Sequence, residues 1–315
     1  MRRHPAGIAL AAVVGLVVLG IVVTALARRP GGPDSGRGAG REVKVLSVDQ
    51  VFDPVGAWLD VFDFNPAHSG AGAEVGVDDI DKMAAAGVRT LYLQAARPED
   101  PRAPGALVNP ELLTRITVRA HQKGLAVVGW YLPHLSDLDA DMGHLKAMIE
   151  FRAGGRPFDA IGLDIEWRGG VADPVVRSAN LVELSRRLRA AAGAIPLGAI
   201  VLPPVLLEVV NPDFWPGFPW AGIKPYFDAW LPMSYWTDRT TASGFRDAHQ
   251  NTLANVVRLR GHLGEVKIHM VGGVATSATT EDYRKFSAAL AETGVAGRSV
   301  YDWASGGVNH VATIR

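Results

Sequence analysis

Eight short apolar runs, rich in β-forming residues, recur along the chain from Ala57 onward, and each begins roughly 32 to 38 residues after the previous one. Their apolar residues are nearly continuous, which is typical of parallel strands covered on both faces. An interval of this length leaves room for one helix between successive strands, so eight such units predict a closed (β/α)8 TIM barrel. The runs cover residues 57–64, 90–96, 126–133, 160–167, 196–203, 229–236, 266–273 and 298–303.

Helical patterns fill several of the intervals between these runs. A doubly wound open sheet is the alternative α/β architecture, but such a sheet normally carries a Gly-rich nucleotide-binding turn after its first strand. The segment VFDFNPAHSG, residues 61–70, contains no such turn, which favours the barrel. Apolar residues at helical spacing that end at Gly predict helices over 77–87, 110–124, 180–193 and 280–294, the last with Thr280 as its N-cap.

The first forty residues predict a membrane-directed segment. Ile8–Ala27 is a stretch of about 20 apolar residues without charge, long enough to span a bilayer. This length favours a retained transmembrane anchor, although Ala25–Ala27 would serve as a small-residue cleavage site of a signal peptide. We expect a cytoplasmic tip with the anchor or signal peptide over 1–29, a flexible Gly/Pro linker over 30–41 and the barrel over 42–315. The barrel would then lie outside the cell, membrane-tethered or secreted.

The composition excludes several classes of function. Thirty-two basic and 32 acidic side chains cancel, so no overall field attracts nucleic acid. The chain has no cysteine, and its nine histidines are scattered without H-x-H or H-E-x-x-H spacing, so we expect no metal and no other cofactor. A phosphosugar enzyme stays open as an alternative, because Gly272–Gly273 and Gly306–Gly307 follow the seventh and eighth runs, the usual phosphate position in such barrels.

The fourth run, FDAIGLDIEW, carries two carboxylates in an apolar setting. Side chains two apart share a face of a strand, so Gly162, Asp164 and Glu166 should all point into the barrel, near the end where barrel active sites lie. Two ionised carboxylates this close in a poorly solvated site repel, so one should keep a proton near neutral pH and serve as a general acid. The structural alternative is that they pair with barrel arginines such as Arg97.

The fourth run also carries a family resemblance. D-A-I-G-L-D-I-E, Asp159 to Glu166, resembles the D-G-x-D-x-D-x-E motif on the fourth barrel strand of the chitinase-like glycoside hydrolase family 18. Asp159, Asp164 and Glu166 match the first, third and last acidic positions of that motif. Gly162 stands at the second acidic position, which is a departure from the family's carboxylate relay.

Two further motifs extend the resemblance. MSYW, Met233–Trp236, is similar to the family's M-x-Y-D on the sixth strand, with Tyr235 matching the tyrosine and Trp236 standing where the acid is expected. Trp303, at the end of the eighth run, resembles the tryptophan of the barrel floor. The resemblance covers the barrel layout and three short motifs, so it points to this family or to a broader group of glycoside-hydrolase-like barrels.

The resemblance implies a mechanism and a substrate class. It implies retaining hydrolysis of an N-acetylhexosamine-containing polysaccharide, in which Glu166 protonates the glycosidic oxygen and the substrate's own 2-acetamido group attacks the anomeric carbon. Asp164 and Tyr235 would orient and stabilise that group. The loss of an acid at Gly162 leaves a second reading, in which a barrel at the cell surface binds a glycan or a partner without cleaving it.

Most glycosidases use a pair of protein carboxylates, so either the substrate or a second carboxylate at the barrel mouth must supply the nucleophile. The seventh run offers no carboxylate at its end, which leaves Asp63 on the first run and Asp302 on the eighth as accessory candidates. The loop Asn211–Trp220, rich in Pro, Gly and aromatic residues, is expected to form a cleft wall or a lid. Residues expected to contact the substrate are Asp63, Gln94, Trp167, Met233, Trp236, Asp302 and Trp303.

Overall fold

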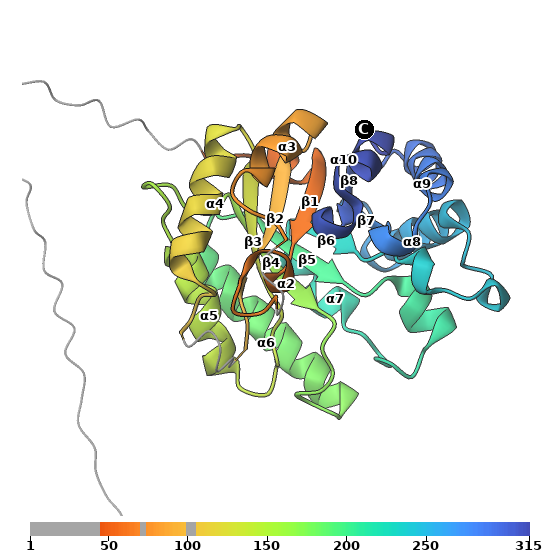
Figure 1. Ribbon diagram of the computed structural model, residues 1–315. Helices are drawn as coiled ribbons and strands as arrows, with labels where there is room; N and C mark the ends of the chain where they lie inside the picture. Colours follow the sequence, from red (N-terminus) through yellow and green to blue (C-terminus); the bar gives the residue numbers. More distant parts are fainter. Residues whose placement is uncertain (1–44, 70–73, 99–104) are drawn as a thin grey trace, which may run out of the picture. The chain divides into compact units, whose positions relative to one another are not determined.

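The computed structural model describes residues 45–69, 74–98 and 105–315, and in this part of the chain eight parallel strands close into a barrel in sequence order (Figure 1). The barrel closes where β8 pairs with β1, with Gly56 opposite Ser299. The predicted TIM barrel is therefore confirmed. The strands are β1 (Val55–Leu59), β2 (Thr90–Ala96), β3 (Ala126–Tyr131), β4 (Ala160–Ile165), β5 (Leu197–Val201), β6 (Ala229–Pro232), β7 (Lys267–Val274) and β8 (Gly297–Tyr301).

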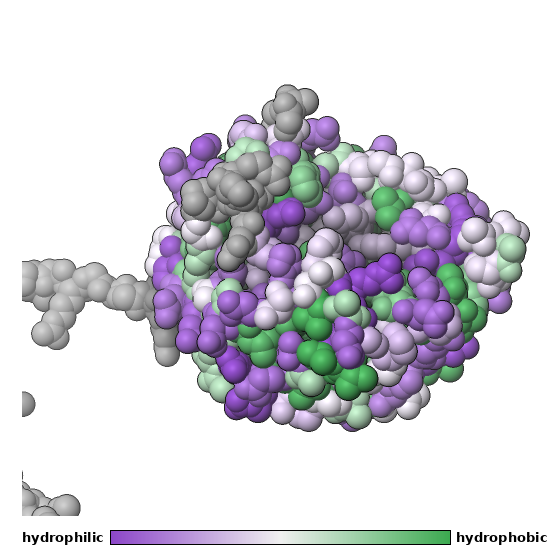
Figure 2. Space-filling view, turned by 90° about the horizontal axis from the view of Figure 1, so that it is seen from below, coloured by the Kyte–Doolittle hydropathy of each residue, from purple (hydrophilic) through white to green (hydrophobic). Residues whose placement is uncertain are grey.

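Helices surround the strands and lie between them in sequence, as Figure 1 shows. The longer ones are α3 (Asp79–Ala86), α4 (Pro110–Gln122), α5 (Leu138–Glu150), α6 (Pro174–Ala192), α8 (Ala248–Leu263), α9 (Thr280–Thr293) and α10 (Trp303–Thr313). The short ones are α1 (Val48–Phe52), α2 (Val61–Phe64) and α7 (Trp220–Ile223), with single turns at Leu206–Val210, Lys224–Tyr226, Trp236–Asp238, Thr241–Ser243 and Ala275–Ser277. On the face shown in Figure 2, hydrophilic residues predominate and hydrophobic residues gather in smaller groups.

Side-chain caps set where the predicted helices begin. The predicted N-cap Thr280 is wrong by one residue, because Thr279 accepts a hydrogen bond from the backbone N–H of Asp282, whose carboxylate accepts the N–H of Thr279 in return. The helix expected from residue 180 begins earlier, at Pro174, because Asp173 caps it and proline is favoured in the first turn.

The first predicted strand, 57–64, is too long. The carboxylate of Asp60 accepts the N–H of Phe62 at 2.7 Å, and that of Asp63 accepts the N–H of Asp60 at 2.9 Å. These two reciprocal caps start α2, so β1 ends at Leu59. Asp63 consequently lies on a helix above the barrel and not on a strand.

The amino end of the barrel is closed by α1. Phe52 is fully buried there, and its carbonyl accepts a hydrogen bond from the ring of His269 at 2.8 Å. A Cβ on Gly297 would lie 2.2 Å from the Phe52 carbonyl oxygen, and one on Gly198 would lie 3.0 Å from the Phe52 ring. Glycine at these two strand starts therefore leaves room for Phe52, which plugs the amino end of the barrel.

The same three residues, Phe-Asp-Ala, lead into strands β4 and β6, at 158–160 and 227–229, and the alanine is the first residue of each strand. The backbone N–H of Asp159 donates to the carbonyl of Val127, and its carboxylate accepts the N–H of Val127, both at 2.8 Å. Asp228 makes the same pair of bonds with Leu197, at 2.9 and 2.8 Å. The first acid of the chitinase-like motif thus fastens the amino end of β4 to β3 and lies at the end of the strand opposite Glu166.

None of the helices within the described residues is long and apolar enough to cross a membrane. The expected anchor Ile8–Ala27 and the linker 30–41 lie outside the described residues, so both stay predictions.

Candidate active site

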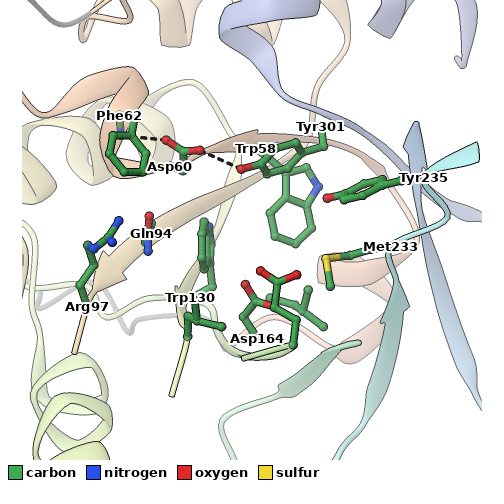
Figure 3. A pocket seen from close by; sticks show the side chains of 13 residues that line it. Trp58, Asp60, Phe62, Gln94, Arg97, Trp130, Asp164, Met233, Tyr235 and Tyr301 are labelled. Carbon is green, nitrogen blue, oxygen red and sulfur yellow. Dashed lines mark hydrogen bonds between the residues drawn. The ribbon is translucent and has the colours of Figure 1, made fainter. Parts of the chain in front are cut away.

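A cavity of about 260 Å³ opens at the carboxyl ends of the strands (Figure 3). Seven of the eight strands, all except β7, contribute to it through their last residues or the residues that follow them. It is the place where barrel enzymes hold their catalytic groups. The cavity is lined by Trp58, Asp60, Phe62, Gln94, Arg97, Trp130, Leu132, Asp164, Glu166, Ile200, Met233, Tyr235 and Tyr301.

Strand β4 directs both of its carboxylates into this cavity. A Cβ on Gly162 would lie 2.9 Å from Ile200 Cδ1 and 3.1 Å from Trp130 Cβ, so position 162 faces the barrel interior. Asp164 and Glu166 follow at intervals of two residues and line the cavity, as the strand alternation predicts. Asp164 is 6% exposed, and its Oδ1 atom has no hydrogen-bond partner among the residues that the structure describes.

Burial governs the acid chemistry of this pair. Burial, and then the charge of Glu166, raise the pKa of Asp164 well above its ordinary value. Burial also raises the pKa of Glu166. A carboxylic acid that keeps its proton near neutral pH can donate it to a leaving group, which is the requirement for a general acid.

Tyr235 enters the cavity from the residues after β6. Met233 continues the sheet, since its N–H donates to the carbonyl of Val201 at 2.9 Å. The ring of Tyr235 lies 5.7 Å from that of Tyr301 between centroids. Burial, followed by the charges of Glu166 and Asp164, raises the pKa of Tyr235 well above its ordinary value, so its hydroxyl remains a donor.

The opposite wall is polar: Figure 3 shows Asp60, Gln94 and Arg97 on it, with Asp60 hydrogen-bonded to Phe62 and Tyr301. The hydroxyl of Tyr301 donates to Asp60 at 2.7 Å, and the second oxygen of Asp60 accepts the N–H of Phe62. Gln94 accepts the N–H of Val61 at 3.0 Å through its side-chain oxygen. The wall therefore presents donors and acceptors in fixed positions, as hydroxyl-rich ligands require.

Aromatic rings form the rest of the floor. Trp58 stacks on Tyr92 at 4.2 Å between centroids with 10° between the planes, and meets Trp130 edge-on at 6.1 Å. The indole N–H of Trp58 donates to the hydroxyl of Ser299 at 2.8 Å, which fixes the ring. Such rigid aromatic surfaces pack well against the apolar faces of sugar rings.

No protein-family model and no curated protein sequence matches the chain. Solved structures do match. A class V chitinase from Pseudomonas fluorescens Pf-5 has a TM-score of 0.59 at 14% identity, covering 83% of this chain and 98% of that one. A family 18 chitinase from Cycas revoluta has a TM-score of 0.56 at 11% identity, covering 82% and 97%. The spore cortex-lytic enzyme SleL of Bacillus cereus has a TM-score of 0.59 at 10% identity, covering 84% and 74%.

The chain has the fold of family 18 chitinases and related glycoside hydrolases. The likeness suggested by three short motifs thus extends to the whole barrel. Of the predicted site residues, the chitinase-like barrel brings Glu166, Asp164, Tyr235, Gln94 and Met233 together in one cavity.

The two accessory acids, Asp63 and Asp302, are not among the residues that line this cavity. Asp63 is tied to the start of α2, where burial first and then the charges of Asp60 and Asp302 raise its pKa to about 8. Asp302 caps α10 and accepts the N–H of Ser305 at 2.7 Å. Aspartates near helix starts often act as caps, so an aspartate at the end of a strand that is followed by a helix can be either a cap or a site residue.

Trp236 and Trp303 do not line this cavity either. Trp236 is fully buried against β7, where a Cβ on Gly273 would lie 2.7 Å from its ring. Trp303 is the first residue of α10 and faces a groove between α3 and α10. Trp167 is 44% exposed and stacks on His134 at 5.8 Å, outside the residues that line the cavity.

Two of the glycines that suggested a phosphosugar enzyme as an alternative, Gly273 and Gly306, are tightly packed against neighbouring side chains. Gly273 gives room to Trp236, as just described, and a Cβ on Gly306, inside α10, would lie 2.6 Å from the Cβ of Ala275. A phosphate-binding loop exposes its backbone N–H groups, whereas side chains of neighbouring residues pack directly against Gly273 and Gly306.

The loop Asn211–Trp220 does not form a wall of this cavity. Trp215 is 1% exposed, donates through its indole N–H to Ser178 at 3.0 Å and lies under the guanidinium of Arg177 at 4.1 Å. The loop is therefore packed against α6 through Ser178 and Arg177. None of its residues, all of which the structure describes, lines the cavity.

Sequence reasoning missed several cavity residues: Trp58, Asp60, Phe62, Leu132, Ile200 and Tyr301. Most of them carry a signal that was available, since they occupy the inward positions of their runs in step with the barrel's alternation. Within the described residues, no group of three or more His, Asp or Glu side chains is arranged to hold a metal ion.

Proposed function

We propose that the chain is a glycoside hydrolase that cleaves an N-acetylhexosamine-containing polysaccharide, with Glu166 as the general acid. The observation that carries the proposal is the meeting of Glu166, Asp164 and Tyr235 in one cavity at the carboxyl ends of the strands. Two of the similar structures support the substrate class: a Nicotiana tobaccum class V chitinase in complex with NAG4 and a Cycas revoluta chitinase in complex with (GlcNAc)4.

In the proposed reaction, Glu166 gives its proton to the glycosidic oxygen as the bond from that oxygen to the anomeric carbon breaks. The carbonyl oxygen of the substrate's 2-acetamido group forms a new bond to the anomeric carbon, while the hydroxyl of Tyr235 donates to that group. Glu166 then takes a proton from the water that opens the intermediate, and the anomeric configuration is retained.

Substrate assistance is favoured because, apart from the buried Asp164 next to Glu166, no second protein carboxylate is well placed among the described residues. Asp63 and Asp302 are engaged as helix caps. Asp60 lines the cavity, but both its oxygens already accept hydrogen bonds, from Phe62 and Tyr301. Hydrogen bonds to a carboxylate stabilise its charge and weaken it as a nucleophile.

The test compares the purified full chain with Glu166→Gln on chromogenic N-acetylhexosaminides and on chitin and peptidoglycan fragments. We expect the substitution to lower kcat by roughly 100- to 10,000-fold. Glu265→Gln is the matched control, because Glu265 is 88% exposed and lies before β7 at the amino end of the barrel. Glucosides that lack the acetamido group should not be cleaved.

The second candidate function is a barrel that binds glycans without cleaving them. It is favoured by Gly162 and by the buried Trp236, which stand where the chitinase-like motifs have acids. Binding of the same fragments by wild type with no turnover of any of them would support this function and exclude the hydrolase.

We further propose that the barrel acts outside the cell, held by the segment Ile8–Ala27 or released after its cleavage. The support is the length and apolarity of that segment. Mass spectrometry of the mature protein distinguishes the two: Met1 or Arg2 at the amino end identifies an anchor, and an end shortly after Ala27 identifies a signal peptide.

A further inference from the structure

The rim of the cavity carries an aromatic pair just beyond β3 and β4. Leu132 and Glu166 line the cavity, and His134 and Trp167 follow them by two residues and by one. The two rings are stacked, with 13° between their planes. A Cβ on Gly170 would collide with the carbonyl oxygen of His134, so the residues after β4 pack tightly on those after β3. Trp167 nevertheless stays 44% exposed, and a fixed, exposed ring is suited to contact with a sugar.

A cation lies next to this aromatic pair. Arg168 follows the cavity residue Glu166 by two residues, so their Cα atoms lie within about 7 Å of each other. The guanidinium of Arg168 lies over the ring of Phe214, 4.8 Å from its centroid, in the loop that follows β5. Arg168 is exposed, and no carboxylate among the described residues forms an ion pair with it. Its N–H donors therefore stay available to a ligand.

A second arginine adds positive charge to this part of the rim. Arg177 on α6 is 2% exposed, lies over the ring of Trp215 and donates to the carbonyl of Phe214 at 3.0 Å. Its Nε atom has no hydrogen-bond partner, and no carboxylate pairs with it, among the described residues. Burial first, and then the charge of Arg168, lower the pKa of Arg177, so the two cations lie close enough to repel. Because buried charges are normally paired, this arrangement points to an anion that binds beside them.

The acids of the same two segments do not neutralise this pair of cations. Asp173 uses its carboxylate to cap α6, where it accepts the N–H of Val175 at 2.8 Å. Asp213 is exposed and forms no ion pair with any described residue. The only neighbouring charge that acts on the pKa of Arg177 is that of Arg168, so neither aspartate offsets the positive charge there.

We propose that Trp167 and Arg168 form a subsite for a carboxylate-bearing sugar, next to the sugar that the cavity holds, so that the chain selects an anionic N-acetylhexosamine polymer over neutral chitin. The subsite itself rests on the geometry of the rim, whereas its use in turnover rests on the proposed function. Trp167 contacts the sugar ring, and Arg168 donates two parallel N–H bonds to the carboxylate, which the planar guanidinium matches in shape. Peptidoglycan supplies such a sugar, since every second N-acetylhexosamine carries a lactyl carboxylate.

Binding can be measured without turnover, by calorimetric titration of the full chain carrying Glu166→Gln. The ligands are peptide-free fragments of peptidoglycan strands, the same fragments with their lactyl carboxylates converted to neutral amides, and chitin fragments of equal length. We expect the carboxylate form to bind roughly tenfold more tightly than the other two, and the preference to shrink as salt is added. Equal affinity for the carboxylate and amide forms would overturn the proposal.

Variants of the arginine separate recognition from packing. Arg168→Gln should remove the preference and leave the affinity for chitin within about twofold, whereas Arg168→Lys keeps the charge without the paired donors and should retain part of the preference. Arg284→Gln is the matched control and should keep all of it, because Arg284 is 67% exposed on α9 and does not line the cavity. An equal loss of affinity for all three ligands in Arg168→Gln would show that Arg168 only holds the loop through Phe214, which would contradict the subsite.

Turnover distinguishes failure of this subsite from failure of the proposed function. In a chain that is otherwise wild type, Arg168→Gln should raise KM for the carboxylate fragments roughly tenfold with kcat nearly unchanged, because a neighbouring sugar is bound equally in the ground state and the transition state. An inactive chain that still prefers the carboxylate form refutes the hydrolase and leaves the subsite in place. An active chain that binds and cleaves both forms equally refutes the subsite alone, and a chain that binds none of the three ligands overturns both.

Discussion

At the scale of single residues, the chemistry of this barrel depends on what surrounds each acid more than on the acid itself. Asp159, Asp164 and Glu166 belong to one short motif. Asp159 accepts the N–H of Val127 and lies beside His121 at 2.8 Å, so it is a structural acid. Asp164 and Glu166 lie in a poorly solvated cavity where burial raises their pKa values. Acids of one short motif thus fasten the strand at one end and line a poorly solvated cavity at the other.

The substitution Gly162→Ala tests the packing beneath Asp164. The new Cβ would meet Ile200 at 2.9 Å and Trp130 at 3.1 Å, so one of them must shift. We expect the free energy of unfolding to fall by about 1–3 kcal/mol, measured by urea denaturation. Gly143→Ala is the control, because Gly143 lies in α5 with open space around it and alanine favours the helix. Equal stability of Gly162→Ala and wild type would contradict the packed floor.

Sequence alone predicted the inward face of β4 because the period of two is unambiguous there. It failed where a run changes structure before it ends. Trp236 belongs to the run 229–236, but β6 stops at Pro232, so the alternation no longer holds four residues later and the ring turns into the core. Tyr301 could not be predicted, because the sequence does not show which of the neighbours Tyr301 and Asp302 faces the cavity, and only the fold places Tyr301 there.

At the scale of elements, the repeated Phe-Asp-Ala sequence fixes the amino ends of β4 and β6 in the same way. Glu166 and Tyr235 each follow the aspartate of their strand by seven residues, Asp159 in one case and Asp228 in the other. Because both aspartates hold the preceding strand through the same two backbone bonds, the two strands enter the barrel alike. The proposed general acid and the proposed acetamido ligand therefore reach the cavity from matched positions.

The short helix α2 should make stability depend on pH through Asp63. Its folded-state pKa of about 8 lies above the ordinary 3.8, so the native state holds this proton more tightly than the unfolded state does. Between these two values the stability contributed by Asp63 falls as pH rises, and it is lost by about pH 8. Asp63→Asn, which mimics the protonated form, should flatten this decline and be more stable than wild type near pH 8.

Urea denaturation of wild type and Asp63→Asn at about pH 5 and pH 8 measures this effect. Asp173→Asn serves as the control, because Asp173 caps α6 from an exposed position and asparagine caps a helix about as well as aspartate. A wild-type protein whose dependence on pH over this range equals that of Asp63→Asn would show that Asp63 is ionised in the native state.

At the scale of the whole molecule, the barrel separates stability from chemistry along its axis. The amino end is closed by α1 and by the glycines that receive Phe52, while the cavity with Asp164 and Glu166 lies at the carboxyl end. This division follows from the parallel arrangement, which gathers all eight strand ends of one kind on one side. Changes at the two ends should therefore affect different measured quantities.

The plug residue gives the sharpest test of that separation. Phe52 is fully buried, so Phe52→Ala should lower the free energy of unfolding by about 3–5 kcal/mol. Because α1 lines no part of the cavity among the described residues, the kcat of the fraction that remains folded should stay within about twofold of wild type. Glu166→Gln should show the reverse, with lost turnover and nearly unchanged unfolding. A fall in kcat for Phe52→Ala as large as its fall in stability would mean that the plug also sets the geometry of the cavity, and that the two ends are coupled through the barrel.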